Sequence, residues 1–586
     1  MRNGQQRSRG AMRQTGSCSI ALLVAIGTAG GLGKLHAQRP ALPDPTQMIL
    51  EDATRGFTPK ARLKVPVSIF AAARKAVESG SELERREALM LFAFSGKDED
   101  RQKLFDISEG KDGELSHRAL VALGISGDPA ASVYLAGILA DRKESTQRRT
   151  FAALALAFDT PRSDEDQTDR GSLLAHHAQI LLNGNTKEFG AELAACFFGM
   201  SRSSSGALFK NYLGQAGGSI SLPEGRKMNV LTSADSDRYL KPLAYGGLAR
   251  RFSSQEEWGY LRPGLNGTRV EARRRFEILW GLRDNPRDSL DKKLLSRIAR
   301  SLERRIEKDS AEENRAAALL ALPLYDKRSG LKRARTIAVS KSRGDRLRSA
   351  AFLVLGRYGE ERDVSIFEKA WHQDLPAEAR AGWNLAYPWL QIRLGTPGLP
   401  MDKAAKTTDL PRPILRLREQ ISLPPGTSPG IAELSAALAL TQVSDRVAAP
   451  RIHMLLQAAH DSFSMRILSR CLLHLAPELV HVKLEDFDSA DPSKWPWQKL
   501  MILGDWGHSL LGPILEKTIS AKNLSPLMRA TLFRLATRAA LGAGYRVDEQ
   551  IRRRLGLSKL PAAFEEAMKW QLRPRSPLAP SPSSGR

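Results

Sequence analysis

Residues 118–128 read R-A-L-V-A-L-G-I-S-G-D, and similar segments stand 31 residues upstream and 31 residues downstream. The upstream segment at 87–97 reads E-A-L-M-L-F-A-F-S-G-K, and the downstream segment at 149–159 reads R-T-F-A-A-L-A-L-A-F-D. Within each segment the apolar residues recur at the spacing of an α-helix. A unit of this kind cannot bury its apolar face alone, so equally spaced units predict a stack of helical repeats.

Looser copies of the same pattern continue downstream. Residues 347–359 read L-R-S-A-A-F-L-V-L-G-R-Y-G, and Leu355 and Gly356 align with Leu123 and Gly124. We interpret each unit as two helices joined by a turn, and Pro129 predicts such a turn because proline is favoured at the first position of a helix. Three further segments carry the same rhythm of Ala, Gly and Leu: 244–252, 315–322 and 433–445.

The segment 117–129, H-R-A-L-V-A-L-G-I-S-G-D-P, resembles a HEAT repeat. It is especially similar to the short bacterial kind found in phycobilisome-lyase-type and related scaffolding proteins, over roughly 60–350 and 430–540. The resemblance implies an all-α fold, an α-solenoid of stacked antiparallel helix pairs in a right-handed superhelix. It also implies that the inner helices form a concave recognition surface. No motif transfers a family active site to this chain.

The composition agrees with helical packing and with a basic surface. Hydrophobic residues make up 42% of the 586 residues, but aromatic residues make up only 6%. Much of the apolar material is Ala and Leu, which suits helix packing better than a sheet. The formal net charge is +25, and such a surface attracts anionic partners. The alternative is that the Arg-rich surface serves only solubility.

The first 37 residues predict an export signal. Four arginines precede an apolar stretch, Ile20 to Leu32, and L-H-A ending at Ala37 is an acceptable cleavage site. The stretch is too short for a comfortable membrane span, although an uncleaved anchor stays as the alternative. Because no twin arginine is present, we expect the general secretory route and a periplasmic or extracellular protein.

The remaining chain divides by its proline and repeat content. Four prolines between 38 and 60 predict an extended lead-in, and seven prolines between 396 and 430 predict a linker, because proline breaks helices. The Pro- and Ser-rich end predicts disorder. The expected parts are a signal peptide (1–37), a lead-in (38–60), an N-terminal HEAT-like solenoid (61–395), a Pro-rich linker (396–430), a C-terminal helical repeat segment (431–572) and a tail (573–586).

The basic segment 327–348 is the main candidate for a binding site. It holds nine Lys or Arg residues and one acidic residue, Asp345. Arg328, Lys332 and Arg335 stand at i, i+4 and i+7 and therefore share one helical face. Guanidinium groups bind anions through paired hydrogen bonds. The earlier basic run at 273–275 would extend this face into a stripe. The alternative is that 327–348 forms a solvated outer helix face that binds no ligand. The candidate residues are Arg273, Arg274, Arg275, Arg328, Lys332, Arg333 and Arg335.

No motif predicts an enzyme, a metal site or a cofactor site. The sequence contains no HExxH, CxxC, Gly-rich phosphate loop or nucleophile elbow. Paired histidines are either adjacent, and so point about 100° apart, or two helical turns apart, so we expect them to be structural. These pairs are His176/His177, His453/His460 and His474/His481.

Six tryptophans and two cysteines are expected to lie in the core. Aromatic platforms can bind sugars or peptides, but clustered tryptophans also fill the space between repeats. A disulfide between Cys196 and Cys471 is not expected, because they are far apart along a stack of repeats. The tryptophans are Trp371, Trp383, Trp389, Trp495, Trp497 and Trp506.

The sequence therefore favours a binding protein. We expect an exported, non-enzymatic repeat scaffold that binds a protein or other macromolecule on its concave surface. The alternative is a binder of an anionic polymer through a basic stripe, with acidic polysaccharide preferred over nucleic acid because an exported chain seldom meets chromosomal DNA. Contact with a membrane is expected only if the N-terminal segment stays attached.

Overall fold

The computed structural model describes most of the chain from Leu42 onwards. The chain divides into two units, 1–41 and 42–586, and every described residue belongs to the second unit. The expected signal peptide (1–37) and tail (573–586) lie outside the described residues. The described ranges are 42–54, 64–110, 113–157, 241–267, 271–285, 290–371, 374–396, 399, 410–480, 484–506 and 511–541, with isolated residues between 173 and 228.

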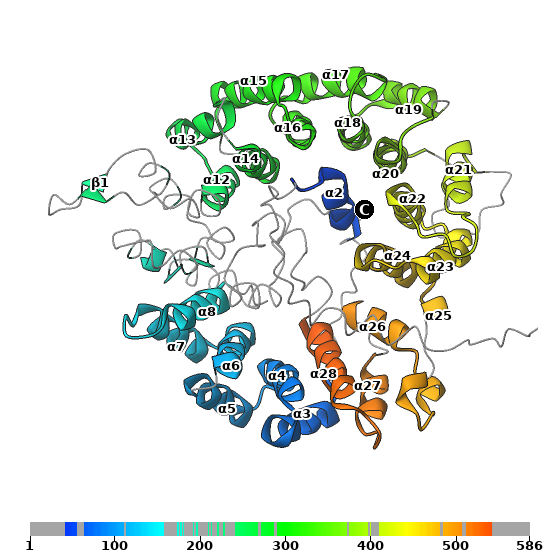
Figure 1. Ribbon diagram of the computed structural model, residues 1–586. Coiled ribbons are helices and arrows are strands. Elements are labelled where there is room, and N and C mark those ends of the chain that lie inside the picture. The colour runs from blue at the N-terminus through cyan, green and yellow to red at the C-terminus, as the bar shows by residue number, and fades with distance from the viewer. Residues whose placement is uncertain are drawn as a thin grey trace, which may run out of the picture. The chain divides into compact units, whose positions relative to one another are not determined.

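The described residues are almost entirely helical, which confirms the predicted all-α class (Figure 1). One antiparallel pair of two-residue strands, β1 (Ile220–Ser221) and β2 (Lys227–Met228), is the exception. The helices in the first part of the chain are α2 (Pro45–Thr54), α3 (Val67–Ser79), α4 (Glu82–Leu91), η2 (Phe92–Phe94), α5 (Asp98–Glu109), α6 (Gly113–Ser126), α7 (Pro129–Ala140), α8 (Thr146–Leu156), α12 (Lys241–Ala249), α13 (Gln255–Asn266), α14 (Ala272–Asp284), α15 (Lys292–Lys308) and α16 (Glu312–Tyr325).

The helices in the second part have the same modest lengths. They are α17 (Lys327–Ala338), α18 (Asp345–Tyr358), η5 (Glu361–Asp363), α19 (Val364–Trp371), α20 (Ala377–Leu394), α21 (Arg412–Gln420), α22 (Ile431–Gln442), η7 (Arg446–Ala448), α23 (Ala449–Ala458), α24 (Ser462–Leu475), α25 (Pro477–Val480), η8 (Leu484–Phe487), η9 (Pro492–Lys494), α26 (Trp497–Trp506), α27 (Leu511–Ile519) and α28 (Pro526–Leu541). None of the described helices is long and apolar enough to cross a membrane.

Consecutive helices pack as hairpins, and the turns follow from local sequence. Helix α6 ends at Ser126, Gly127 adopts a φ of +68°, and α7 begins at Pro129. The carboxylate of Asp128 caps α7 by accepting a hydrogen bond of 2.8 Å from the amide of Ala130. The turn that Pro129 predicts between the two helices is therefore confirmed.

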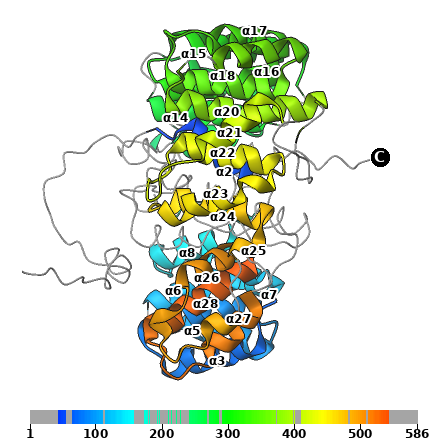
Figure 2. The ribbon, with the colours of Figure 1, turned by 90° about the vertical axis from the view of Figure 1, so that its right-hand side faces the viewer.

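The helices form two layers that follow the chain. The even-numbered helices from α4 to α28, here called the inner layer, pack each against the next described one: α4 to α8 in one run and α12 to α28 in another. The odd-numbered helices from α3 to α27, here called the outer layer, pack each against an inner neighbour. Figures 1 and 2 show α15 and α17 outside α16 and α18.

The glycine of the repeat lets neighbouring inner helices approach closely. A Cβ added to Gly124 in α6 would lie 2.3 Å from the carbonyl oxygen of Ala155 in α8. A Cβ on Gly356 in α18 would lie 2.5 Å from the carbonyl oxygen of Ala386 in α20. Because both contacts are with backbone, a larger residue would push the two helices apart. The aligned glycines thus serve stacking.

Ion pairs link neighbouring outer helices in a recurring pattern, here called the outer ladder. In each pair an arginine on one outer helix binds an aspartate at the start of the next, and three of the four pairs are bidentate with N–O distances of 2.6–3.0 Å. The pairs are Arg74–Asp100, Arg101–Asp128, Arg335–Asp363 and Arg418–Asp445. These four arginines therefore join neighbouring repeats.

Two segments that were expected to be extended or to form a linker each contain a helix. The lead-in 38–60 contains helix α2, and the linker 396–430 contains helix α21. In each case a proline stands at the start of the helix, where no amide donor is lost: Pro45 opens α2, and Pro411 precedes α21. Inner helix α20 packs directly against α22, so the linker does not separate two stacks.

The last described helix packs against the first repeats. Helix α28 lies against α4, and its Arg534 binds Glu87 at 2.6 Å. Arg529, also on α28, binds Glu84 at 2.5 Å. Both glutamates are almost completely buried, so these pairs replace the water that the carboxylates have lost.

Candidate anion-binding groove

A groove runs between the neighbouring outer helices α13 and α15. The hydroxyl of Ser254 caps α13 through a capping box with Glu257. The carboxylate of Asp291 caps α15 by accepting a hydrogen bond of 2.7 Å from the amide of Leu294. The two helices contact each other, and the amide group of Asn266 approaches the hydroxyl of Ser301 at 3.4 Å. Caps and packing thus fix the walls of the groove.

The groove is strongly basic. Its volume is about 600 Å³, and four arginines but no aspartate or glutamate line it. Arg262, Arg300 and Arg304 are exposed and Arg297 is half-buried. The lining residues are Gln255, Trp258, Gly259, Arg262, Pro263, Asn266, Arg297, Arg300, Ser301 and Arg304.

The spacing of the arginines places them on one side of α15. Arg297, Arg300 and Arg304 stand at i, i+3 and i+7, and Arg262 faces them from α13. None of the four forms an ion pair with a carboxylate among the residues that the structure describes. Arg300 makes one hydrogen bond of 3.4 Å, to the carbonyl oxygen of Ser296. The outer ladder has no pair between α13 and α15 within the described ranges.

The neighbouring charges also indicate a positive potential. Arg305, next to the groove, is buried. Its pKa is lowered, first by burial and then by the charge of Arg275; the charge of Asp309, which lies 3.7 Å away, opposes this shift, and Arg304 contributes a smaller lowering. Like charges lower the pKa of a cation because they disfavour its charged form. Among the groove arginines, Arg304 contributes to this repulsion.

The groove lining also includes a hydrogen-bond acceptor. Pro263 lies inside α13 and has no amide hydrogen, so the carbonyl of Gly259 lacks its usual i+4 donor. Trp258 is 2% exposed, and its ring is therefore not available for stacking. The groove combines cations for anionic groups with a carbonyl that can accept from a hydroxyl.

The predicted basic run 273–275 lies on α14 of the inner layer and is not part of the groove lining. Arg273 and Arg275 are buried in α14. Arg275 binds Asp309 at 2.9 Å and the carbonyl oxygens of Leu265 and Gly267. The guanidinium of Arg274 lies 5.5 Å from the ring centre of Tyr245. The run joins helices together and does not extend an exposed stripe.

The predicted residues of 327–348 separate into exposed and paired cations on α17. Arg328 and Lys332 are exposed. Arg333 binds Glu307 of α15, and Arg335 binds Asp363 in the outer ladder. Residues two apart on a helix point in nearly opposite directions, so these two pairs hold α17 to its neighbours on both sides. The hydrogen bond to Asp363 raises the pKa of Arg335.

The remaining candidates, the tryptophans, the cysteines and the metal-ligating side chains, show no reactive or metal-binding arrangement among the residues that the structure describes. The ring centres of Trp371 and Trp383 lie 5.3 Å apart with the rings tilted by 51°, and Trp383 donates to the carbonyl of Phe367. Cys196 and Cys471 are buried free thiols, and burial raises the pKa of Cys471 to about 12. In the described part of the chain, no group of three or more His, Cys, Asp or Glu side chains is placed to hold a metal ion.

Sequence reasoning missed the groove arginines, although part of the signal was readable. The segment 292–308, K-K-L-L-S-R-I-A-R-S-L-E-R-R-I-E-K, carries its cations on one helical side. The charge run at 327–348 is denser, so the sequence predicts a binding surface there more strongly. Arg262 is 35 residues upstream of Arg297, so only the packing of α13 on α15 could bring them together.

Comparisons with known proteins give no family for this chain. No family model matches, and no curated protein matches. Among solved structures, human deoxyhypusine hydroxylase in complex with glycerol aligns at 14% identity over 59% of this chain and 97% of its own, with a TM-score of 0.19. An engineered protein aligns at 14% identity over 81% and 98%, with a TM-score of 0.23. Similarities at these TM-scores carry no argument about fold or function.

Proposed function

We propose that this chain is a non-enzymatic, HEAT-like α-solenoid that binds an anionic polymer in the groove between α13 and α15. The two-layer packing of helix hairpins and the close approaches at Gly124 and Gly356 support the solenoid; its right-handed superhelix is part of the proposal. In this proposal the protein is exported, so its ligand is an acidic polymer of the cell envelope or the surroundings. No cofactor is required.

The observation that carries the proposal is the contrast between paired and unpaired arginines. Arginines of the outer ladder have aspartate partners, whereas the four groove arginines face a common hollow without a carboxylate among its lining residues. Bringing like charges together costs free energy unless a counter-charge is present. A multivalent anion supplies that counter-charge to all four at once.

The lining favours an acidic polysaccharide over single-stranded nucleic acid. Nucleic-acid grooves usually present exposed aromatic rings on which bases stack, and the one aromatic lining residue here, Trp258, is buried. The carbonyl of Gly259 can accept a hydrogen bond from a sugar hydroxyl. Sulfate or carboxylate groups would bind the guanidinium groups.

The experiment is equilibrium binding of a fluorescein-labelled heparin octasaccharide, measured by fluorescence anisotropy. In the groove variant the four arginines become glutamine (R262Q, R297Q, R300Q, R304Q). If each exposed contact contributes ~0.5–1 kcal/mol, their loss weakens binding by about 30-fold or more. A competing oligothymidylate is expected to displace the octasaccharide poorly.

The matched control removes four exposed cations from other outer elements. Lys103, Arg142, Lys143 and Lys369 are exposed, and K103Q, R142Q, K143Q and K369Q change the net charge by the same amount. This variant should bind within about threefold of the wild type. Equal losses in the two variants would mean that the octasaccharide senses net charge only, and the groove would not be its site.

A second comparison separates the groove from the exposed pair on α17. The double variants R300Q/R304Q and R328Q/K332Q each lose two charges. The proposal predicts that the first weakens binding more than the second. The opposite order would move the site to α17 and support the basic stripe expected from the sequence.

A further inference from the structure

The cations on one side of α15 extend beyond both ends of the groove. Arg297, Arg300 and Arg304 line the groove, and Lys293 and Lys308 stand four residues before and four residues after them. This spacing keeps all five side chains within an arc of about 80° around the helix. At a rise of about 1.5 Å per residue, the five cations cover about 22 Å of the helix axis. We call them the cation row.

The two outer lysines of the cation row are not used by carboxylates. Lys293 and Lys308 are both exposed, and neither forms an ion pair among the residues that the structure describes. The acidic residues of the facing helix α13, Glu256 and Glu257, do not line the groove. The carboxylate of Glu257 accepts a hydrogen bond of 3.2 Å from the amide of Ser254, as part of the cap of α13. No carboxylate in the groove lining therefore offsets the row.

The cation row is unfavourable for the helix that carries it. Like charges three or four residues apart are neighbours on a helix and destabilise it, and the row contains four such pairs in succession. Lys293 also stands in the first turn of α15, which holds no acidic residue, and the helix dipole disfavours a cation there. The next inner helix, α16, follows the usual rule and begins with Glu312 and Glu313. Such a departure from local preference is expected at a functional site, where a ligand compensates for it.

The flank of α15 that faces α17 is occupied by ion pairs. Glu307 of α15 binds Arg333 of α17 and Arg343, which follows α17. On the other flank, Ser301 approaches Asn266 of α13. The cation row lies between these two flanks and runs along the helix axis. A polyanion that crosses towards α17 therefore encounters Glu307, whereas one that follows α15 stays on cations.

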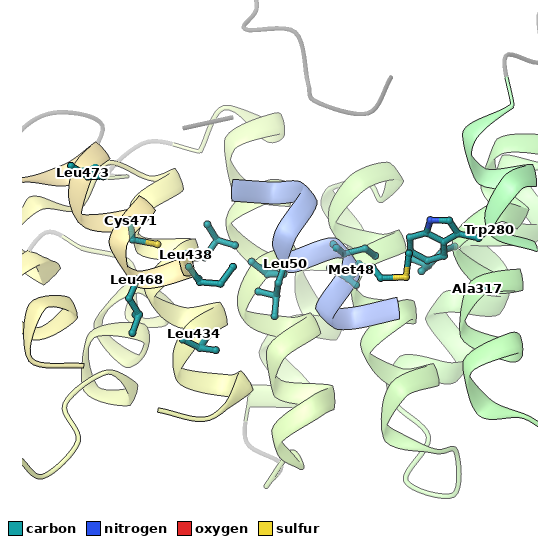
Figure 3. Close-up of a cluster of buried hydrophobic side chains, with 14 of the residues drawn as sticks. Met48, Leu50, Trp280, Ala317, Leu434, Leu438, Leu468, Cys471 and Leu473 are labelled. Atoms are coloured by element: carbon teal, nitrogen blue, oxygen red, sulfur yellow. The ribbon is translucent and has the colours of Figure 1, made fainter. Parts of the chain in front are cut away.

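The inner side of these repeats is covered by α2. This helix contacts the inner helices α16, α18, α20, α22 and α24. Figure 3 shows Met48 of α2 pointing towards Trp280 of α14, with Leu50 on the side of Leu438 of α22. All four side chains belong to the buried hydrophobic cluster. The inner surface at this place is apolar and filled, so a polyanion finds its cations on the outer layer.

We propose that an acidic polysaccharide lies lengthwise along α15, with Lys293 and Lys308 as outer subsites beyond the two ends of the groove. The proposal rests on the proposed function of the groove and adds the direction and the length of the ligand. The three groove arginines of α15 cover about 10 Å of the helix axis, against about 22 Å for the whole cation row. The ligand is therefore a linear chain with acidic groups along its length, and a fragment that covers only the groove binds more weakly.

The test compares two ligand lengths at low salt, where weak binding to cations is measurable. The probes are a fluorescein-labelled heparin octasaccharide and a fluorescein-labelled heparin disaccharide, followed by fluorescence anisotropy. We expect the variant K293Q/K308Q to bind the octasaccharide about tenfold more weakly than the wild type, but the disaccharide within about twofold, because the disaccharide covers only the groove. The salt slope for the octasaccharide should become shallower by about 1.5, as each lost contact contributes roughly 0.7–0.9.

The matched control is the variant K292Q/K332Q. Lys292 is exposed and lies about 100° around α15 from Lys293, and Lys332 is exposed on α17. This control should bind the octasaccharide within about twofold of the wild type. Equal losses in the two double variants would overturn the lengthwise arrangement, since the octasaccharide would then cross to α17 or sense net charge only.

A stability measurement separates binding from folding. Because K293Q/K308Q removes like-charge pairs, it should unfold at a temperature no lower than that of the wild type. A lower unfolding temperature would assign the two lysines to the fold and overturn the proposal.

The groove variant (R262Q, R297Q, R300Q, R304Q) distinguishes failure of this proposal from failure of the proposed function. If the groove variant weakens binding of both probes while K293Q/K308Q binds the octasaccharide like the wild type, the lengthwise arrangement is wrong and the groove remains the site. If K293Q/K308Q weakens both probes equally, the lysines are not outer subsites and the arrangement is also wrong. If the groove variant binds both probes like the wild type, the proposed function itself is wrong.

Discussion

The guanidinium of Arg335 on α17 donates two hydrogen bonds to the carboxylate of Asp363, at 2.6 and 3.0 Å. The side chain of Asp363 is 1% exposed and that of Arg335 is 25% exposed. A nearly buried carboxylate needs its cation, because an unpaired buried charge is strongly destabilising. Arg335 therefore joins two outer helices, although its spacing from Arg328 suggested an anion-binding face.

Replacing Arg335 should lower stability without weakening anion binding. We expect Arg335→Gln to reduce the free energy of unfolding by ~1–3 kcal/mol, because Asp363 then loses its charged partner. Heparin affinity should stay within about twofold. Thermal unfolding measures the loss of stability, and fluorescence anisotropy measures the heparin affinity of the same preparation. A stable variant with tenfold weaker heparin binding would instead assign Arg335 to a binding surface.

Two glycines in helices give a matched pair of stability tests. Gly356→Ala should destabilise the protein by ~1–3 kcal/mol, because its Cβ would meet the backbone of Ala386. Gly137 is inside the outer helix α7, and a Cβ there meets nothing within 4 Å. Gly137→Ala should stabilise by ~0.5–1 kcal/mol, since alanine is the better helix former. Equal effects in denaturant unfolding would contradict the close-approach explanation of the repeat.

His117 should make the protein sensitive to mild acid. Its pKa is lowered to about 4, first by burial and then by the charge of Arg148, and its ring stacks on Phe151 at 4.2 Å. Because the folded pKa is below the unfolded value of 6.5, the contribution of His117 to stability is present above pH 6.5 and is lost as pH falls towards 4.

The test compares the wild type with His117→Phe, which keeps the aromatic stack but cannot be protonated. Between pH 6.5 and 4 the wild type should lose on the order of 1–2 kcal/mol more than the variant, after allowance for solvent around the partly exposed ring. Thermal unfolding across this range measures the difference. Parallel curves for the two proteins would show that His117 does not titrate with unfolding.

The repeat helices were predictable because their signal is local. The apolar pattern of 118–128 returns 31 residues upstream and 31 residues downstream, and the Gly127–Asp128–Pro129 turn carries its own capping chemistry. The prolines misled at 38–60 and 396–430 because proline breaks the interior of a helix but is favoured at its start. A count of prolines in a window cannot distinguish these positions.

Whether a given basic residue is buried in an ion pair or exposed to solvent was not predictable from one sequence. Arg275 and Arg328 look alike in the chain, yet one is buried against Asp309 and the other is exposed. What separates them is the position of a carboxylate on a neighbouring repeat. The groove has the same origin, because α13 and α15 each supply only half of it.

The salt dependence of heparin binding tests the central claim most directly. The logarithm of the association constant for the octasaccharide is plotted against the logarithm of NaCl concentration for the wild type, the groove variant and the charge-matched control. If four ion contacts are lost, the slope of the groove variant should be shallower by about three, as each contact contributes roughly 0.7–0.9. The slope of the control should change by less than about one. Equal slopes for the groove variant and its control would contradict the account.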